Sequence, residues 1–458
     1  MEILDRWTGE KVGEVALEGE ATALARVERA ARAFERLRRT PSHARRDGLA
    51  RVARGLEARA EELARTIARE AGKPIALARA EVTRAASTFA LAAEEATRLG
   101  GEVMRLDVTP AAEGYEGSWT REPMGPVLGI APFNFPLNLV AHKVAPAIAC
   151  GASVVLKPAP QTPLTALLLE EIVRASGLPE DALQVAPCDV AVAERLARDD
   201  RFAVLSFTGS DRVGWHLKAI AGKKRVLLEL GGNAAAIVHE DAPNLAMAAG
   251  RIVSGAYGYA GQVCIKVQRL YVHRPIAERF VADVVARASA LEPRAPLDEA
   301  AVIGPMIDAA AAARVDAWVD EAIAKGAKPL LRGARDGARL GPSVLWFDGA
   351  GAGCKVVDEE VFGPVLTVHP YDAWDDALAM ADASRFGLQA GIFTDSWARI
   401  QAAWTRLHVG GLVVGDVPTF RVDNMPYGGT RDSGFGREGV RFAIEEMTER
   451  KLLVTRRP

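Results

Sequence analysis

Apolar and charged residues alternate with a helical period over the first hundred residues of the chain. Between Leu17 and Leu99 the sequence is rich in Ala, Arg, Glu and Leu, and apolar residues recur at helical spacing, as in residues 49–58. A Gly-Lys-Pro sequence at residues 72–74 breaks the pattern, which argues against the sustained heptads of a coiled coil. We therefore expect a layer of separate helices.

After residue 122 the pattern changes to short apolar runs that Pro or Gly closes, with helical segments between them. The expected strands are residues 127–131, 152–156, 203–207 and 226–228, and the expected helices are 163–176 and 190–198. This alternation predicts a parallel sheet of βαβ units with helices on its faces. A second alternating region, residues 231–430, includes a strand at 269–273 and a helix at 276–291, and it predicts a second α/β domain.

Two segments do not fit either region. Residues 100–122 contain the turn signals Thr109-Pro110 and Glu113-Gly114, which indicate a projecting hairpin or a connecting arm. The tail, residues 445–458, ends in a short apolar run with basic flanks. It predicts pairing with another strand, such as one of a second subunit.

The composition points to a globular protein whose partners are small molecules or copies of itself. A chain of 458 residues exceeds one core of ordinary size, so two or more packed units are expected. With 49% hydrophobic residues, 25% charged residues and a net charge of -2, there is no strong field to attract nucleic acid or an anionic membrane. The longest apolar stretch, residues 144–156, is shorter than the roughly 20 residues that span a bilayer. No secretory signal is readable at residues 1–6, so a cytoplasmic protein is expected.

Cysteine spacing excludes two common structural devices. The four cysteines, at 150, 188, 264 and 354, are widely spread and form no CxxC pair. This spacing argues against a disulfide framework and against a structural zinc site, and no metal is expected.

Cys264 is the candidate nucleophile, because it follows a Gly-containing turn and has two chemical partners elsewhere in the sequence. A lone cysteine is usually a small buried apolar residue. Thioester chemistry needs an exposed sulfur, a base and a donor for the oxyanion. Glu229 ends an apolar strand at a Gly-Gly turn, where burial raises a carboxyl pKa toward neutrality. Its alternative reading is an ion-paired carboxylate at a strand end.

Asn134 is the candidate oxyanion donor. It lies between two aromatic residues and two prolines, which hold its amide rigidly and exclude water. An asparagine that forms a turn is the alternative.

The sequence contains no standard nucleotide-binding fingerprint. Neither Gly-x-Gly-x-x-Gly nor a P-loop is present. The segment 207–214 closes a strand and opens a helix, which leaves free N–H groups for a pyrophosphate. Lys157 ends another strand, where its ammonium can bind ribose hydroxyls, although a solvated surface lysine is the alternative.

Seven segments together resemble the aldehyde dehydrogenase superfamily, and the likeness covers almost the whole chain in the family's order. These segments are Pro132-Phe133-Asn134-Phe135-Pro136, Lys157-Pro158, Phe207-Thr208-Gly209-Ser210, Leu228-Glu229-Leu230-Gly231-Gly232, Gly261-Gln262-Val263-Cys264, Glu359-Glu360-Val361-Phe362-Gly363-Pro364 and Pro426-Tyr427-Gly428-Gly429. The resemblance implies an NAD(P)-dependent aldehyde dehydrogenase of the hydrolytic branch.

The resemblance also implies a role for each candidate. Cys264 attacks the aldehyde, Asn134 stabilises the oxyanion, and Glu229 activates the water that hydrolyses the thioester. Lys143 and Glu438 match positions that assist proton traffic. The implied cofactor-binding residues, among which Glu360 and Phe362 position the nicotinamide ribose and ring, are Ala131, Pro132, Phe133, Lys157, Ala159, Gly209, Ser210, Val213, Gly214, Leu230, Glu360 and Phe362.

Three units follow from the same resemblance. They are a Rossmann-like dinucleotide-binding domain (residues 1–104 and 122–230), a catalytic domain (231–430) and a small β bridging and oligomerisation element (105–121 and 440–458). A homodimer or a homotetramer is expected.

The cofactor and the substrate are less well defined. Pro160 replaces an acid that many NAD-preferring members carry, so NADP as well as NAD is expected. His142, Lys266 and Arg421 are candidate substrate-binding residues for a small polar or anionic aldehyde, although Lys266 and Arg421 are equally compatible with ordinary surface charges. Residues 415–439 resemble members that act on lactaldehyde or semialdehydes.

Three rival functions are weaker. A CoA-acylating relative commonly lacks the base that Glu229 supplies, and a non-catalytic relative is expected to lose the base or the nucleophile. A cysteine hydrolase needs a histidine partner, and none of the seven histidines is marked as one for Cys264.

Replacing the four cysteines one at a time tests the choice of nucleophile. We expect Cys264→Ser to nearly abolish aldehyde-dependent reduction of the cofactor, measured by absorbance. The matched variants Cys150→Ser, Cys188→Ser and Cys354→Ser are expected to keep most of the activity. Equal losses in all four would point to a folding effect instead.

Overall fold

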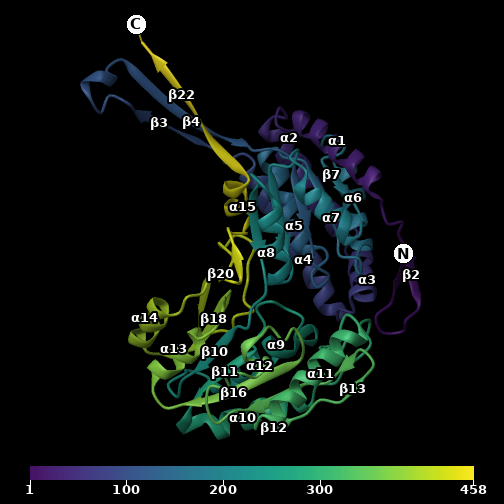
Figure 1. Ribbon diagram of the computed structural model, residues 1–458, viewed down its shortest axis with the longest axis vertical. Helices are drawn as coiled ribbons and strands as arrows, with labels where there is room; N and C mark the ends of the chain where they lie inside the picture. Colours follow the sequence, from purple (N-terminus) through teal and green to yellow (C-terminus); the bar gives the residue numbers. More distant parts are fainter. Residues whose placement is uncertain (458) are drawn as a thin grey trace.

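A six-stranded sheet forms the centre of the upper lobe in the computed structural model, which describes residues 1–457 (Figure 1). Its strands, in spatial order, are β21 (Gly434–Phe435), β9 (Arg225–Glu229), β8 (Val204–Thr208), β5 (Val127–Ile130), β6 (Val154–Lys157) and β7 (Leu183–Val185). All neighbours are parallel except β21, which pairs antiparallel with β9. The order runs outward from β5 in both directions, as in doubly wound folds.

Eight helices accompany this sheet. They are α1 (Glu20–Leu37), α2 (Ser42–Ala58), α3 (Ala60–Ala71), α4 (Ile75–Glu95), α5 (Asn138–Cys150), α6 (Leu164–Arg174), α7 (Val190–Arg198) and α8 (Asp211–Ile220). Successive strand residues enter different cores, because side chains alternate across a strand. Val154 and Leu156 join the core shared with α2 to α6, whereas Val155 joins the core shared with α1, α7 and α8. Helices therefore cover both faces, which explains the continuous apolar runs in the strands.

A seven-stranded sheet forms the lower lobe. Its strands, in spatial order, are β12 (Lys328–Leu331), β15 (Ser343–Trp346), β16 (Val365–Tyr371), β11 (Arg269–His273), β10 (Ala235–Val238), β18 (Gln389–Phe393) and β19 (Gly411–Val414). Its helices are α9 (Leu245–Tyr257), α10 (Arg274–Ser289), α11 (Ala309–Ala324), α12 (Lys355–Asp358), α13 (Trp374–Asp382) and α14 (Trp397–Arg406). Only β12 is antiparallel to its neighbour among these strands.

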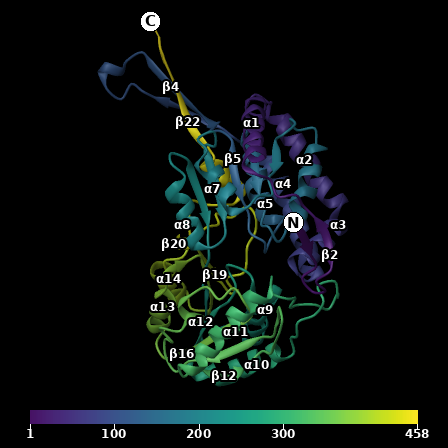
Figure 2. The ribbon, with the colours of Figure 1, turned by 45° about the vertical axis from the view of Figure 1, so that its right-hand side comes forward.

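A three-stranded arm projects from the upper lobe, and the C-terminus lies near its tip (Figures 1 and 2). It consists of β3 (Gly101–Arg105), β4 (Tyr115–Pro123) and β22 (Thr448–Arg456), and the helix α15 (Val440–Glu446) precedes β22. The predicted hairpin is therefore present. The tail pairs along its length with β4 of its own chain, from Thr448 opposite Pro123 to Arg456 opposite Tyr115, and this pairing needs no second subunit.

The remaining elements are short. They are β1 (Glu2–Leu4), β2 (Lys11–Glu14), η1 (Pro110–Ala112), η2 (Gly258–Gly261), β13 (Arg335–Asp336), β14 (Arg339–Leu340), β17 (Phe386–Gly387) and β20 (Thr430–Arg431).

The predicted α/β class, with largely parallel sheets and a helical N-terminal layer, is confirmed. The structure adds β21, which returns from a late part of the chain to the edge of the first sheet. The sequence missed this two-residue strand because it is too short to show a period. Among the described residues no helix is long and apolar enough to cross a membrane.

Candidate active site

The loop that carries Cys264 begins in a strained conformation. In η2, Tyr259 and Ala260 adopt left-handed backbone angles, with φ of 54° and 53°. Such a conformation costs roughly 1–3 kcal/mol for a residue with a side chain, so the surroundings must enforce it. The buried side chain of Gln262 supplies part of this constraint, because its Oε1 accepts a hydrogen bond of 2.8 Å from the N–H of Ile307.

Cys264 differs from the other three cysteines in its surroundings. It is half-buried, whereas the others are buried. Its Sγ lies 3.4 Å from the hydroxyl of Tyr427. Desolvation of the thiol raises its pKa to about 11, so the isolated thiol is neutral at physiological pH. A base is needed for it to act as a nucleophile.

Asn134 lies between β5 and α5 and contacts the Cys264 loop directly. Its Nδ2 donates a hydrogen bond of 2.9 Å to the carbonyl oxygen of Gln262, two residues before the sulfur. The Nδ2 group has a second hydrogen, which this contact does not use. The structure thus brings together the predicted nucleophile and the predicted oxyanion donor.

Glu229 ends β9 in a buried position near two other ionisable groups. Burial raises its pKa well above the ordinary value, and the charge of Glu438 raises it further. Its Oε2 has no hydrogen-bond partner. Glu438 in turn bonds Lys143, whose Nζ lies 3.2 Å from Oε1 of Glu438 and 2.6 Å from Oγ1 of Thr208. Three predicted residues therefore gather in one buried cluster.

Arg421 joins this cluster from the other side of Glu438. Its Nη2 donates a hydrogen bond of 3.0 Å to Oε2 of Glu438, and its guanidinium lies 3.7 Å from the ring centroid of Tyr427. Burial alone would raise the pKa of Glu438, but the charges of Lys143 and Arg421 outweigh it and lower the pKa to about 2. The Nε of Arg421 is buried without a partner.

His142 also faces the site with an unused nitrogen. Its Nε2 lies 3.0 Å from Oδ1 of Asp423, whereas its buried Nδ1 has no partner. Burial lowers the pKa of His142, so the ring is neutral at physiological pH. In that form, with Nε2 donating to Asp423, Nδ1 is a free acceptor.

Lys266 is placed differently. Its buried Nζ donates a hydrogen bond of 2.6 Å to the carbonyl oxygen of Val365, and burial lowers its pKa to about 7. This contact gives the side chain a structural role, so we do not include Lys266 in the proposed substrate site.

A cleft of about 690 Å³ opens at the carboxyl ends of the strands in the first sheet. Seven of the predicted cofactor-binding residues line it: Ala131, Pro132, Lys157, Ala159, Gly209, Ser210 and Val213. The predicted Gly214 lies beneath it, where an added Cβ would be only 2.3 Å from Cδ2 of Leu230. A side chain at residue 214 would therefore displace the side chain of Leu230.

The other predicted cofactor residues lie between this cleft and the Cys264 loop. Oε1 of Glu360 accepts a hydrogen bond of 3.0 Å from the N–H of Gly232. Gly232 itself packs closely against the Cys264 loop, because a Cβ added to it would lie 2.7 Å from the carbonyl oxygen of Cys264. The rings of Phe133 and Phe362 meet edge to face, with centroids 5.9 Å apart. A nicotinamide dinucleotide fits this donor set, because the cleft has room for it and α8 begins there with main-chain donors that no side chain caps.

Several residues with close contacts in the site had no role predicted from the sequence. They are Ser206, Thr208, Gln262, Asp423 and Tyr427. Tyr427 belongs to a motif that carries the family resemblance, and that motif was the only signal for it. Asp423 had no signal, because only folding brings it to His142.

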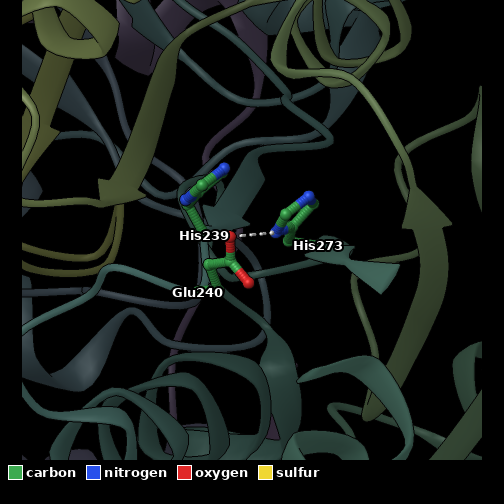
Figure 3. A group of neighbouring side chains, drawn as sticks. All are labelled: His239, Glu240 and His273. Carbon is green, nitrogen blue, oxygen red and sulfur yellow. Dashed lines mark ion pairs between the residues drawn. The ribbon is translucent and has the colours of Figure 1, made fainter. Parts of the chain in front are cut away.

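One group among the described residues has metal-ligand character, and it lies in the lower lobe (Figure 3). It consists of His239, Glu240 and His273. The two imidazole rings are stacked, with centroids 4.2 Å apart and planes at 13°. A ring nitrogen directs its lone pair within the ring plane, so stacked rings do not converge well on one ion. Oδ1 of Asp241 also binds His239, and the cationic Arg399 binds Asp241. We assign no metal to this group.

Comparison with known proteins identifies the family. The model of the aldehyde dehydrogenase family matches residues 1–453. The chain belongs to this family. The predicted enzyme class, an aldehyde dehydrogenase, is thereby confirmed.

Individual relatives are similar over their whole length. The chain is 42% identical to a 3-sulfolactaldehyde dehydrogenase from Priestia aryabhattai, over 99% of this chain and 94% of the relative. Aldehyde dehydrogenase 21 from Physcomitrella patens, solved with the reaction product succinate, superposes with a TM-score of 0.97 at 40% identity, covering 100% of this chain and 95% of that one. The glyceraldehyde-3-phosphate dehydrogenase of Methanocaldococcus jannaschii, solved with NADP, superposes with a TM-score of 0.95 at 34% identity. The match covers 100% of this chain and 99% of that one.

The pH dependence of this aldehyde dehydrogenase tests the buried base. Only the carboxylate form of Glu229 accepts a proton, and burial holds the pKa of Glu229 well above the ordinary value of about 4.3. The steady rate is therefore expected to increase with pH over a range that lies well above the ordinary pKa of a glutamate. In Glu229→Gln the first burst of reduced cofactor should persist, while the steady rate falls and loses this rise. Stopped-flow absorbance measures both phases. A wild-type pH profile in the variant would remove Glu229 from the step.

Proposed function

We propose that the chain oxidises a small aldehyde with a negatively charged tail to its carboxylic acid, using NAD or NADP as the hydride acceptor. The observation that carries this proposal is the buried Nε of Arg421, which has no hydrogen-bond partner. The guanidinium lies over the ring of Tyr427, the residue whose hydroxyl is next to the nucleophile. A buried cationic donor without an acceptor is costly, and an anionic group of a substrate would supply the acceptor.

The charges around Glu438 support an anionic substrate. Glu438 is a carboxylate between the cations Lys143 and Arg421. Burial favours the protonated, neutral form of Glu229. These four groups therefore have a net charge of about one positive unit before the base is ionised. A carboxylate or a sulfonate would neutralise it.

His142 supports a second polar group on the substrate. Its free Nδ1 would accept a hydrogen bond from a hydroxyl next to the aldehyde carbon. A hydroxyl at this position agrees with the 3-sulfolactaldehyde dehydrogenase among the similar proteins, and the succinate complex agrees with the anionic tail alone.

In the proposed mechanism Sγ of Cys264 attacks the carbonyl carbon, and the thiol proton passes to solvent water. The oxyanion accepts hydrogen bonds from Nδ2 of Asn134 and the main-chain N–H of Cys264. Glu360 and Phe362 would hold the nicotinamide, which would supply the acceptor for the hydride, and loss of the hydride leaves a thioester on Cys264.

Hydrolysis then depends on the buried carboxylates. Glu229 accepts a proton from the water that attacks the thioester carbonyl, and the carboxylic acid leaves as Cys264 is restored. Lys143, which contacts both Glu438 and Thr208, is placed to assist the return of this proton toward solvent.

Cofactor choice follows from the cleft. Arg212 lines it, and Pro160 supplies no acid that would repel a 2′-phosphate. Glu194 also lines the cleft, but its Oε1 lies 2.9 Å from Nε2 of His216. We therefore propose that NADP is accepted as well as NAD.

A panel of aldehydes assayed with each cofactor tests the proposed function. Free acid should accumulate, whereas rapid acyl-CoA formation on addition of CoA would favour the acylating alternative.

Replacing Arg421 tests the anionic specificity. In Arg421→Met, kcat/KM for succinic semialdehyde should fall by about 10- to 100-fold, because a charged hydrogen bond contributes about 1.5–3 kcal/mol. The loss with the neutral propionaldehyde should be much smaller. Lys266→Met is the matched control, since it also removes a buried cation, and it should affect both aldehydes alike. A uniform loss in Arg421→Met would contradict an anion site.

We also propose that the arm joins subunits into a homodimer or a homotetramer. On β22, Leu452, Leu453 and Val454 are 54%, 62% and 46% exposed, which is unusual for adjacent apolar residues on an edge strand. Light scattering should give the mass of an oligomer for the wild type and a smaller mass for the double variant Leu452→Glu/Leu453→Glu. A wild-type monomer, or an unchanged mass, would contradict the proposal.

A further inference from the structure

A buried ion pair lies behind the two loops that carry Asn134 and Cys264. Lys73 follows Gly72, the left-handed residue that ends α3, and Glu81 lies in the first half of α4. The two residues are 1% and 2% exposed, and Nζ of Lys73 binds Oε2 of Glu81. A buried pair is weak evidence for stability, because desolvation offsets its attraction, so its other contacts deserve an explanation.

Glu81 binds the start of the helix that follows the Asn134 loop. Its Oε1 accepts hydrogen bonds of 2.9 and 3.1 Å from the N–H groups of Leu137 and Asn138. A carboxylate is favourable at this end of α5, where main-chain donors have no partners within the helix. Glu81 therefore fixes the point at which the Asn134 loop enters α5.

Lys73 contacts both loops with one ammonium group. Its Nζ lies 3.5 Å from the ring centroid of Phe135 and 4.7 Å from that of Tyr259. Phe135 follows Asn134 in the chain, and Tyr259 is the first left-handed residue before Cys264. The hydroxyl of Tyr259 also donates a hydrogen bond of 2.8 Å to the carbonyl oxygen of Ala71. The chain segment around Lys73 thus holds the strained loop from behind.

We propose that Lys73 and Glu81 are positioning residues that hold the Asn134 and Cys264 loops in register, so that the amide and the sulfur face the same carbonyl group. This inference rests on the proposed function of Asn134 and Cys264. Neither Lys73 nor Glu81 touches the reacting atoms. Their effect is exerted through Phe135, Tyr259 and the start of α5, and the left-handed backbone persists because such contacts enforce it.

Removing either charge tests the positioning role. In Lys73→Met and in Glu81→Gln, kcat should fall by about 10- to 100-fold, as expected for a displacement of the catalytic groups of about 1 Å. The dissociation constant for the cofactor should change less than kcat, because most residues that line the cleft lie outside the Asn134 loop. The double variant should lose little more than the more damaging single variant, since both residues act through one pair.

Alkylation of Cys264 by iodoacetamide gives a readout that does not depend on turnover. Loosening the loop hydrates the thiol of Cys264, which lowers its pKa and increases the fraction of reactive thiolate. The rate of alkylation should therefore rise in the variants in which kcat falls. Mass spectrometry should show a single label, because the buried Cys150, Cys188 and Cys354 react only if the protein unfolds.

Glu70→Gln is the matched control. Glu70 is also a buried carboxylate that accepts hydrogen bonds, of 2.9 and 3.0 Å, from the N–H groups of Leu164 and Thr165 at the start of α6. That helix carries none of the proposed catalytic residues. The Glu70→Gln control should keep the wild-type kcat and the wild-type alkylation rate, even if its melting temperature falls as much as that of Glu81→Gln.

Three results would overturn the inference. They are a wild-type kcat in both single variants, a wild-type alkylation rate in both, or equal changes in Glu70→Gln. If Lys73→Met does not fold, Phe135→Leu keeps the ion pair but removes one ring from the ammonium, and it should show the same two changes. An inactive wild-type protein would instead overturn the proposed function, and the alkylation rates would still test the positioning.

Discussion

The carboxylate of Glu438 between two buried cations is the interaction on which the proposed site depends. Without it, Lys143 and Arg421 would be two uncompensated buried charges, which is costly. With it, Lys143 is held against Thr208, Arg421 lies over Tyr427, and the hydroxyl of Tyr427 reaches the sulfur. One side chain thereby orders groups from both ends of the chain.

The same site leaves several polar atoms without partners. Eight buried side-chain atoms of residues 1–457 have none, and four of them belong to Asn134, His142, Glu229 and Arg421. Folded proteins rarely tolerate such atoms, so their concentration around the proposed site is consistent with a ligand that completes the hydrogen bonding. The stability of the fold is supplied elsewhere, by the apolar cores on the faces of the two sheets.

Much of the architecture was readable from the sequence, because buried parallel strands and amphipathic helices leave strong patterns. The helix at residues 190–198 has the predicted bounds, and the strand at 269–273 does as well. Cys264, Glu229 and Asn134 were proposed from the sequence because their motifs are distinctive, and the structure brings the Asn134 side chain to the Cys264 loop. Lys266 shows the limit, since the sequence does not reveal that a lysine near the nucleophile binds the carbonyl oxygen of Val365. Contacts between distant segments, such as Asp423 with His142 or Lys73 with Tyr259, likewise had no local signal.

The late return of the chain to the first sheet has a consequence for biosynthesis. Strand β21 and Glu438 lie within the last 25 residues of the 458-residue chain, whereas Lys143 and Glu229 are made much earlier. During translation the N-terminal lobe can begin to fold while its edge next to β9 is still open and Lys143 has no counter-ion. The buried cluster around Glu438 is therefore completed only once residue 438, which lies 295 residues after Lys143, has been translated.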